Sequence, residues 1–134
     1  MSALPEERAH IIGIRNSLLA LHKILLELER QRYERTNGRI NDMFQLLNLT
    51  INDPAFAWLR PLSAFIVEID EKSEDKEAPM TSAEVVAFLK QARTLLSANQ
   101  VGGEFQRNYH WALQESPDVV IAHAALLKRL TLPS

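Results

Sequence analysis

The hydrophobic residues between Ile11 and Tyr33 recur at the spacing of an α-helix. One row alternates steps of three and four residues, and a second row lies about 100° further round the helix. The first row is Ile11, Ile14, Leu18, Leu21, Leu25 and Leu28, and the second is Ile12, Leu19, Leu26 and Tyr33. The pattern predicts one N-terminal helix of about 45 Å that ends near Arg35, before Thr36-Asn37-Gly38. We expect the rest of the chain to pack around it.

Ionisable residues interrupt this apolar arc at seven-residue spacing, as Arg15, His22 and Glu29. Arg15 and Glu29 would be about 21 Å apart along the helix axis, so they cannot pair with each other. Because an unpaired buried charge costs several kcal/mol, each of them needs a partner on another helix. Structural ion pairs, or side chains that extend their charged ends to the surface, are one interpretation. The alternative is a cleft in which Arg15 binds a small anion.

The next segments continue the helical pattern with breaks at proline. Residues 39–49 predict a second helix, in which Ile40, Met43, Phe44 and Leu47 form the stripe that faces the core. Asp53 then precedes Pro54, which is the order of an N-cap and a first helical residue. Pro61 removes a backbone hydrogen bond, and this predicts either a kink near residues 58–60 or a short helix followed by a new one.

The remaining pattern indicates four more helices. After Pro61, an inward stripe is formed by Leu62, Phe65, Ile66 and Ile69, and residues 73–80 lack periodicity and predict a loop. Thr81 and Glu84 match a capping box, which predicts a helix from there to about Asn99. Further helices are predicted over residues 104–115 and 119–130, the second of them after the N-cap Ser116.

The last predicted helix is apolar nearly all round, and it therefore belongs in the middle of a bundle or in a dimer interface. No segment shows convincing alternation of a strand. We therefore predict an all-α fold, a single domain over residues 1–134 with five to seven helices, of which the first is by far the longest.

Composition narrows the function classes. The chain has 134 residues, of which 46% are hydrophobic and 24% charged, and no cysteine, which excludes disulfides, thiolate zinc sites and cysteine nucleophiles. A net charge of −2 disfavours nucleic acid as a partner. The first ten residues lack the pattern of a signal peptide, and no apolar run approaches the length of a membrane span. We expect a cytoplasmic protein.

His22 and His123 are the candidate metal ligands. The helical neighbours of His22 are leucines, and those of His123 are valines and leucines, so both imidazoles should project into apolar surroundings. With Glu29 they could hold a divalent metal between the first and last helices. The alternative is that each is a core histidine that bonds a carbonyl or a carboxylate. An enzyme that uses His22 as a base would also need an open cleft.

A second group of residues is a candidate interface. Trp58 and Arg60 flank the proline break, and Trp111 lies off the face formed by Phe105 and Tyr109. Core anchoring is the favoured interpretation for the aromatic residues at the proline break, and an interface hot spot, in which Trp and Arg are enriched, is the alternative. The apolar last helix adds Leu126, Leu127 and Leu130 to the candidates.

Three segments together carry a family resemblance: residues 21–35 (LHKILLELERQRYER), 52–71 (NDPAFAWLRPLSAFIVEIDE) and 108–126 (NYHWALQESPDVVIAHAAL). They resemble a group of small, helical proteobacterial proteins of uncharacterised function. The resemblance implies a bacterial, cytoplasmic, all-helical domain, and it brings no activity or functional residue with it.

Two functions from different classes follow from these observations. The first is a non-enzymatic module that acts through protein contacts as a homodimer or with another protein partner, without a cofactor. The second is a bundle that binds a metal or small ligand between the first and last helices through His22, Glu29 and His123.

Overall fold

The computed structural model describes residues 1–97 and 102–130, and in these residues the chain folds as an all-α bundle, as predicted. Its helices are α1 (Pro5–Asn37), α2 (Met43–Asn52), the 3-10 helix η1 (Pro54–Leu59), α3 (Arg60–Glu74), α4 (Ser82–Leu95), α5 (Glu104–Glu115) and α6 (Pro117–Arg129). The predicted end of the helix near Asn99 lies outside the described residues. The described helices include none that is long and apolar enough to cross a membrane.

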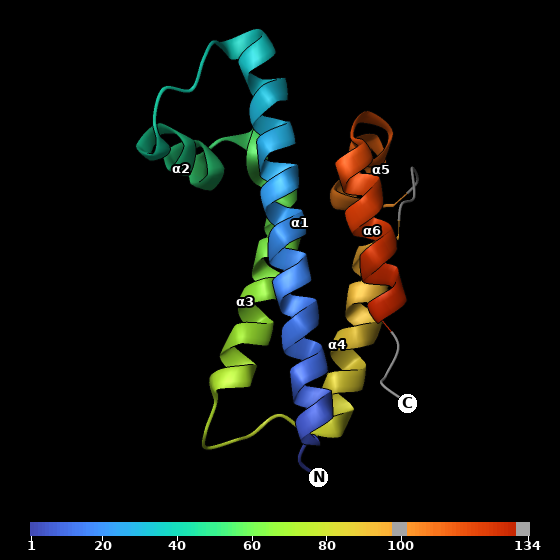
Figure 1. The fold of residues 1–134 in the computed structure, drawn as a ribbon. Coiled ribbons are helices and arrows are strands. Elements are labelled where there is room, and N and C mark those ends of the chain that lie inside the picture. The colour runs from blue at the N-terminus through green and yellow to red at the C-terminus, as the bar shows by residue number, and fades with distance from the viewer. Residues whose placement is uncertain (98–101, 131–134) are drawn as a thin grey trace.

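Helix α1 is the spine of the molecule, with α3 and α4 along its lower part and α6 along its upper part (Figure 1). Its first apolar row supplies the buried residues Ile11, Ile14, Leu18, Leu21 and Leu25. Side chains from every other helix except α2 join them in one core cluster. The N-terminal residues run beside the start of α4, where the amide of Ala3 donates to the carbonyl of Met80 at 2.9 Å.

The proline break resolves as two helices. Asp53 caps η1 by accepting a hydrogen bond from the amide of Ala55 at 2.8 Å, and α3 begins directly after η1, with Pro61 in its first turn. The capping box of α4 also forms, because Thr81 and Glu84 exchange hydrogen bonds of 2.9 and 3.1 Å. These local signals could be predicted because each depends on neighbours in sequence.

The burial of α6 and α2 differs from the predicted patterns. Helix α6 does not lie in the middle of the bundle, since only Val119 and Leu126 within it are buried, whereas Val120, Ile121 and Leu127 are exposed. The alternative, that α6 lies in a dimer interface, stays a prediction. One side of α6 packs on α1 and α5, and no described helix covers the other. The apolar stripe of α2 does not face the core either, because no residue of α2 is buried. Of the predicted stripe, only Ile40, which precedes the helix, is in the core.

Candidate functional site

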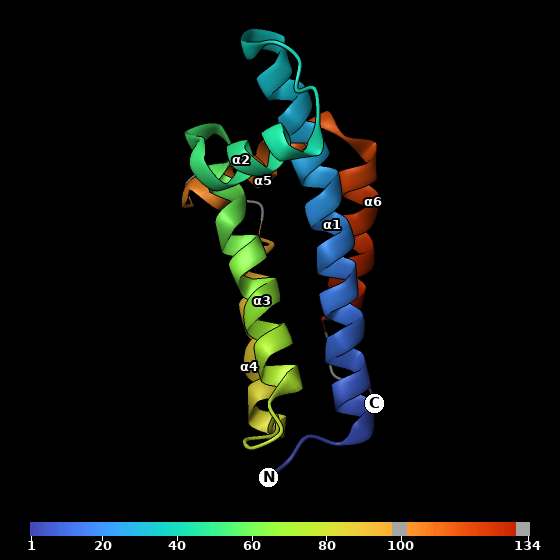
Figure 2. The same cartoon turned by 90° about the vertical axis from the view of Figure 1, so that its left-hand side faces the viewer.

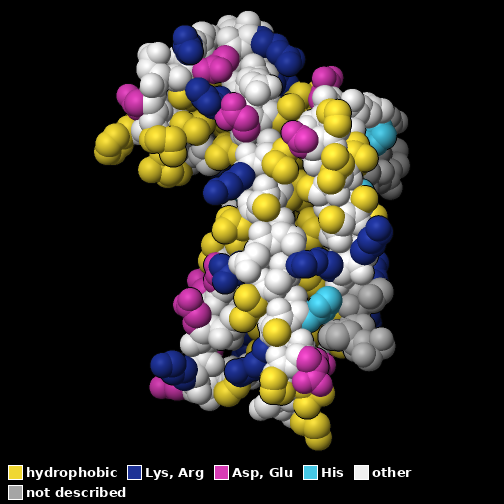
Figure 3. Space-filling view, in the orientation of Figure 1, with side chains coloured by type: hydrophobic (Ala, Val, Ile, Leu, Met, Phe, Trp, Pro, Cys, Tyr) yellow, Lys and Arg dark blue, Asp and Glu magenta, His cyan; other side chains and the backbone are white. Residues whose placement is uncertain are grey.

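The apolar face of α2 is the largest departure from an ordinary helical surface in the described part of the chain. Met43 is 76% exposed, Phe44 87%, Leu47 56% and Ile51 57%. These residues follow the spacing of one helical face. Figure 3 shows the hydrophobic side chains gathered where α2 projects from the body, above a notch in the outline.

Local contacts hold α2 in this projecting position. Asp42 caps its first turn by accepting a hydrogen bond from the amide of Gln45 at 2.8 Å. At its other end, the guanidinium of Arg60 donates to the carbonyl of Ile51 at 2.5 Å. Leu46 and Leu49 attach the helix to the core along the side opposite the exposed face. Figure 2 shows α2 lying across the upper end of α3 instead of along it. The exposed face is therefore fixed and outward.

A hollow of about 240 Å³ lies between α2 and the body of the protein. Its lining comes from α1, from the segment that joins α1 to α2, and from α2 itself: Arg30, Ile40, Asn41, Asp42, Met43 and Leu46. Ile40 is buried, whereas Met43 also belongs to the exposed face. The hollow and the exposed apolar face are thus parts of one continuous surface.

Glu29 is a carboxylate in the core, only 1% exposed. The indole N–H of Trp58 donates to it at 2.6 Å, and Arg32 donates to both carboxylate oxygens, with its Nε at 3.1 Å. Arg32 also donates to the side-chain oxygen of Asn108 at 3.0 Å, and its guanidinium carbon lies 3.7 Å from the centre of the Trp111 ring. The ion-pair partner Arg32 is on the same helix, and the partner on another helix, as predicted for Glu29, is the neutral Trp58 of η1.

Two of the three candidate metal ligands, His123 and Glu29, have partners of their own. The hydroxyl of Tyr109 lies 2.8 Å from Nδ1 of His123, while Glu29 is taken up by Trp58 and Arg32. Burial lowers the pKa of His123 and that of His22, and it raises the pKa of Tyr109. Within residues 1–97 and 102–130, no three His, Cys, Asp or Glu side chains are grouped so that they could hold a metal ion. The expected convergence of His22, Glu29 and His123 is not found.

Arg15 has a partner on another helix, since its Nε lies 3.1 Å from a carboxylate oxygen of Asp70 in α3. Both side chains are about one third exposed, with values of 30% and 38%. This is the structural ion pair that one of the two interpretations required. A partly exposed pair of this kind contributes at most about 1 kcal/mol.

The residues predicted to form an interface divide into two groups. Trp58, Leu126 and Leu130 are buried in the core, which contradicts their assignment to an interface. The indole N–H of Trp58 donates to the buried carboxylate of Glu29, and its ring packs against that of Phe105. A buried tryptophan needs such a hydrogen-bond acceptor for its N–H. Arg60, Trp111 and Leu127 reach the surface, and Arg60 adjoins the exposed face of α2 through Ile51.

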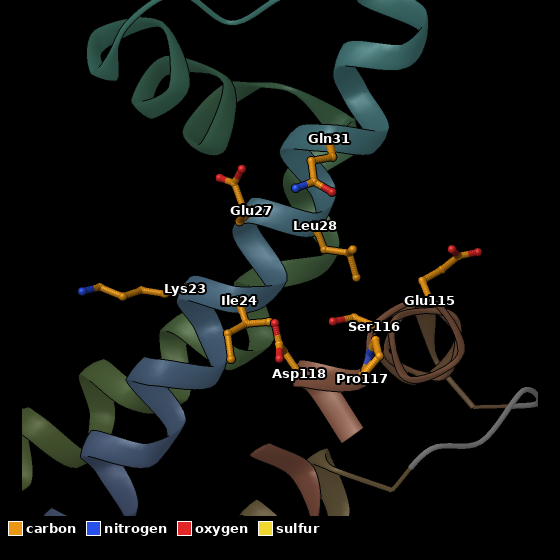
Figure 4. A pocket seen from close by; sticks show the side chains of 9 residues that line it. All are labelled: Lys23, Ile24, Glu27, Leu28, Gln31, Glu115, Ser116, Pro117 and Asp118. Atoms are coloured by element: carbon orange, nitrogen blue, oxygen red, sulfur yellow. The ribbon is translucent and has the colours of Figure 1, made fainter. Parts of the chain in front are cut away.

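A shallow groove of about 450 Å³ separates α1 from the junction of α5 and α6. Figure 4 shows Leu28 pointing from α1 toward Ser116 and Pro117, whereas Lys23 and Glu27 point to the other side of α1. The lining also includes Ile24, Gln31, Glu115 and Asp118. This groove lies between the first and last helices, as expected of a ligand site, but neither His22 nor His123 lines it.

The helical period identifies the apolar residues of α2, but the predicted direction of this stripe, toward the core, is wrong. The predicted core stripe contains Met43, Phe44 and Leu47 and does not include Ile51. A stripe at helical spacing looks the same whether it faces the core or a partner. The signal that was present is the absence of any charged residue between Met43 and Asn52, because interface centres are depleted in charge.

Comparison with protein families, curated proteins and solved structures found no match to this chain. The resemblance to proteobacterial helical proteins therefore stays a prediction, and the functional argument depends on the geometry alone.

Proposed function

We propose that this protein is a non-enzymatic module that forms a homodimer through the exposed face of α2. The observation that carries the proposal is the exposure of Met43, Phe44, Leu47 and Ile51 on one fixed helical face. Together they present on the order of 500 Å² of apolar surface, given that one aromatic side chain alone can bury about 150–250 Å². Patches larger than a few hundred Å² on soluble proteins mark interaction sites.

The composition of α2 supports a protein partner. The helix contains no charged residue, and the polar side chains of Asn48 and Thr50 flank the apolar face. An uncharged apolar centre with a polar rim is the usual anatomy of a protein interface. About 800 Å² per partner is typical of a stable complex, so the four apolar residues would supply the larger part of such an area.

The charges around α2 favour a second copy of the chain as the partner. Arg39 and Asp42 lie at the start of the helix, and Asp53 and Arg60 lie at its end. A rim that carries both signs can be complementary to itself, and it does not select a strongly charged partner. A membrane surface is a poorer fit, because an anionic headgroup layer would meet the carboxylates of Asp42 and Asp53.

Sedimentation velocity at micromolar concentration tests the dimer. We expect the native chain to sediment as a dimer and Leu47→Glu to sediment as a monomer, because the new charge would be buried in the interface. Gln45→Glu is the matched control, since it adds the same charge to the opposite side of α2 and should leave the dimer intact. Circular dichroism checks that both variants keep their helix content.

A native chain that stays monomeric throughout the micromolar range would refute the proposal. Equal sedimentation of the two variants would also refute it. Co-flotation of the native monomer with phosphatidylserine-containing vesicles, lost in Leu47→Glu, would replace the second copy by a lipid surface.

The groove between α1 and α6 supports a second candidate function, the binding of a small ligand. Its volume of about 450 Å³ falls in the range of ligand pockets. The carboxylates of Glu115 and Asp118 beside the apolar Leu28 and Pro117 would suit a cationic ligand with an apolar part. Thermal unfolding in the presence of spermidine, whose ammonium groups are joined by methylene chains, tests this function, and an unchanged Tm would count against it.

A further inference from the structure

The hollow beneath α2 and the side chain of Phe44 lie on opposite flanks of the same exposed face. On a helix of 3.6 residues per turn, Leu46 lies about 60° to one side of Met43 and Phe44 about 100° to the other. Leu47 falls between Met43 and Phe44, near the middle of the arc. Met43 and Leu46 line the hollow, so a cavity flanks the arc on one side and a protruding ring flanks it on the other.

The cavity and the ring match in size and in axial position. The hollow holds about 240 Å³, and an apolar cavity of about 150 Å³ is enough to hold a benzene molecule. Phe44 and the residues of α2 that line the hollow lie within about 5 Å of each other along the helix axis. Phe44 is 87% exposed, so its ring is not packed against the rest of its own chain.

The lining of the hollow suits an aromatic ring. Ile40, Met43 and Leu46 present apolar groups, and Arg30 contributes a cationic side chain. The guanidinium of Arg30 donates through Nη1 to Glu27 at 3.2 Å, and its buried Nε lies 3.8 Å from a carboxylate oxygen of Glu34. A guanidinium group favours the face of an aromatic ring, and a ring in the hollow could stack on this group while both ion pairs remain.

We infer that in the dimer proposed above, on which this inference depends, Phe44 of each copy inserts into the hollow beneath α2 of the other. A two-fold axis parallel to α2, passing above Leu47, relates the two copies. It places the Phe44 side of the face in one copy opposite the hollow in the other. The same operation therefore seats both rings at once, as an isologous interface requires. Phe44 and the hollow then determine the specificity of self-association, while Leu47 and Ile51 contribute general apolar contact.

Sedimentation equilibrium of two complementary variants tests the inference. Phe44→Ala removes the ring, and we expect it to weaken the dimer by about 30-fold or more, the range of an interface hot spot. Leu47→Ala is the matched control on the same face, and its effect should be clearly smaller. Asn41→Phe places a ring of the chain's own into the hollow and should also weaken self-association, because the ring of the partner is then excluded.

The mixture of Phe44→Ala with Asn41→Phe gives the decisive measurement. In the mixed dimer the remaining Phe44 enters the open hollow, and the filled hollow faces only an alanine. The two variants should therefore form a heterodimer more tightly than either forms a homodimer. Both substituted residues, Phe44 and Asn41, are exposed in the single chain. The free energy of unfolding of each monomeric variant, measured in urea, should therefore stay close to that of the native monomer.

The outcomes separate this inference from the proposed function. If the native chain dimerises and Leu47→Glu abolishes the dimer, but the mixture gains no affinity over the single variants, the seating of Phe44 is refuted and the α2 dimer stands. An effect of Phe44→Ala no larger than that of Leu47→Ala would refute it as well. A monomeric native chain refutes both proposals together.

Discussion

The buried carboxylate of Glu29 allows the strongest prediction about stability. It accepts a hydrogen bond from the indole of Trp58 at 2.6 Å and forms an ion pair with Arg32. Substitution of Glu29 by alanine removes the acceptor and leaves the N–H of Trp58 buried without a partner. It also leaves Arg32 without its counter-charge, although Arg32 keeps Asn108 and a side chain that is 34% exposed.

The magnitude follows from these separate losses. An orphaned buried N–H costs about 1–3 kcal/mol. Breaking a fully buried ion pair by removing one partner costs about 3–5 kcal/mol, and the partial exposure of Arg32 reduces this share. We therefore expect Glu29→Ala to lower the free energy of unfolding by about 3 kcal/mol, which corresponds to a loss on the order of 10 °C in Tm for a domain of this size. Glu29→Gln keeps an oxygen for Trp58 and should cost about 1–2 kcal/mol.

Urea unfolding, followed by circular dichroism and by tryptophan fluorescence, measures these values. Trp58 contacts Glu29 directly and Trp111 lies beneath Arg32, so both tryptophans report on the cluster. Glu27→Ala is the control, because Glu27 pairs with Arg30 at 3.2 Å on the surface of the same helix and should contribute less than about 0.5 kcal/mol. If Glu29→Ala and Glu27→Ala were equally stable, the proposed energetic role of the buried cluster would be wrong.

Two further predictions concern the histidines and Gly38. Burial lowers the folded-state pKa values of His22 and His123 below their ordinary value of 6.5, so their contribution to stability is complete above that pH and is lost as the pH falls through the folded-state values. Between about pH 7.5 and about pH 5, the urea midpoint of the native chain should fall more than that of a His22→Gln, His123→Gln double variant, and equal slopes would contradict this. Gly38, with φ of 86° and ψ of 169°, has a backbone conformation that is nearly restricted to glycine, so Gly38→Ala should lower the free energy of unfolding by about 1–3 kcal/mol. Gly103→Ala, at a φ of −68°, is its control in the same urea titration and should cost less.

The helical architecture could be predicted because its signals are local. The apolar period of α1, the capping box at Thr81, and the proline starts of η1 and α6 depend on residues within a few positions of each other. The hydrogen bonds of a helix and of its caps join residues three or four positions apart, so they do not depend on how the helix packs in the fold. The element boundaries accordingly agree with the structure to within a few residues.

The location of the candidate site could not be predicted in the same way, because it depends on which side of each helix the other helices cover. The apolar residues of α2 can be recognised from their period, but only the structure shows that Phe44 faces outward. His22, Glu29 and His123 were recognised as polar residues in apolar surroundings, yet no local rule could show that His123 would meet Tyr109 and Glu29 would meet Trp58. Such contacts join residues far apart in sequence, and helical period carries no information about the partner.

The sequence alone thus determined the helices, their caps and the long apolar spine from Ile11 to Leu28. Only the tertiary structure decided that α2 projects with its apolar face uncovered and that Glu29 is buried against an indole instead of a metal. The physical reason is that hydrophobic burial is non-directional. The period of a sequence specifies that an apolar face needs cover, and the packing of the whole chain decides whether that cover comes from its own core or, as we propose for α2, from a second copy.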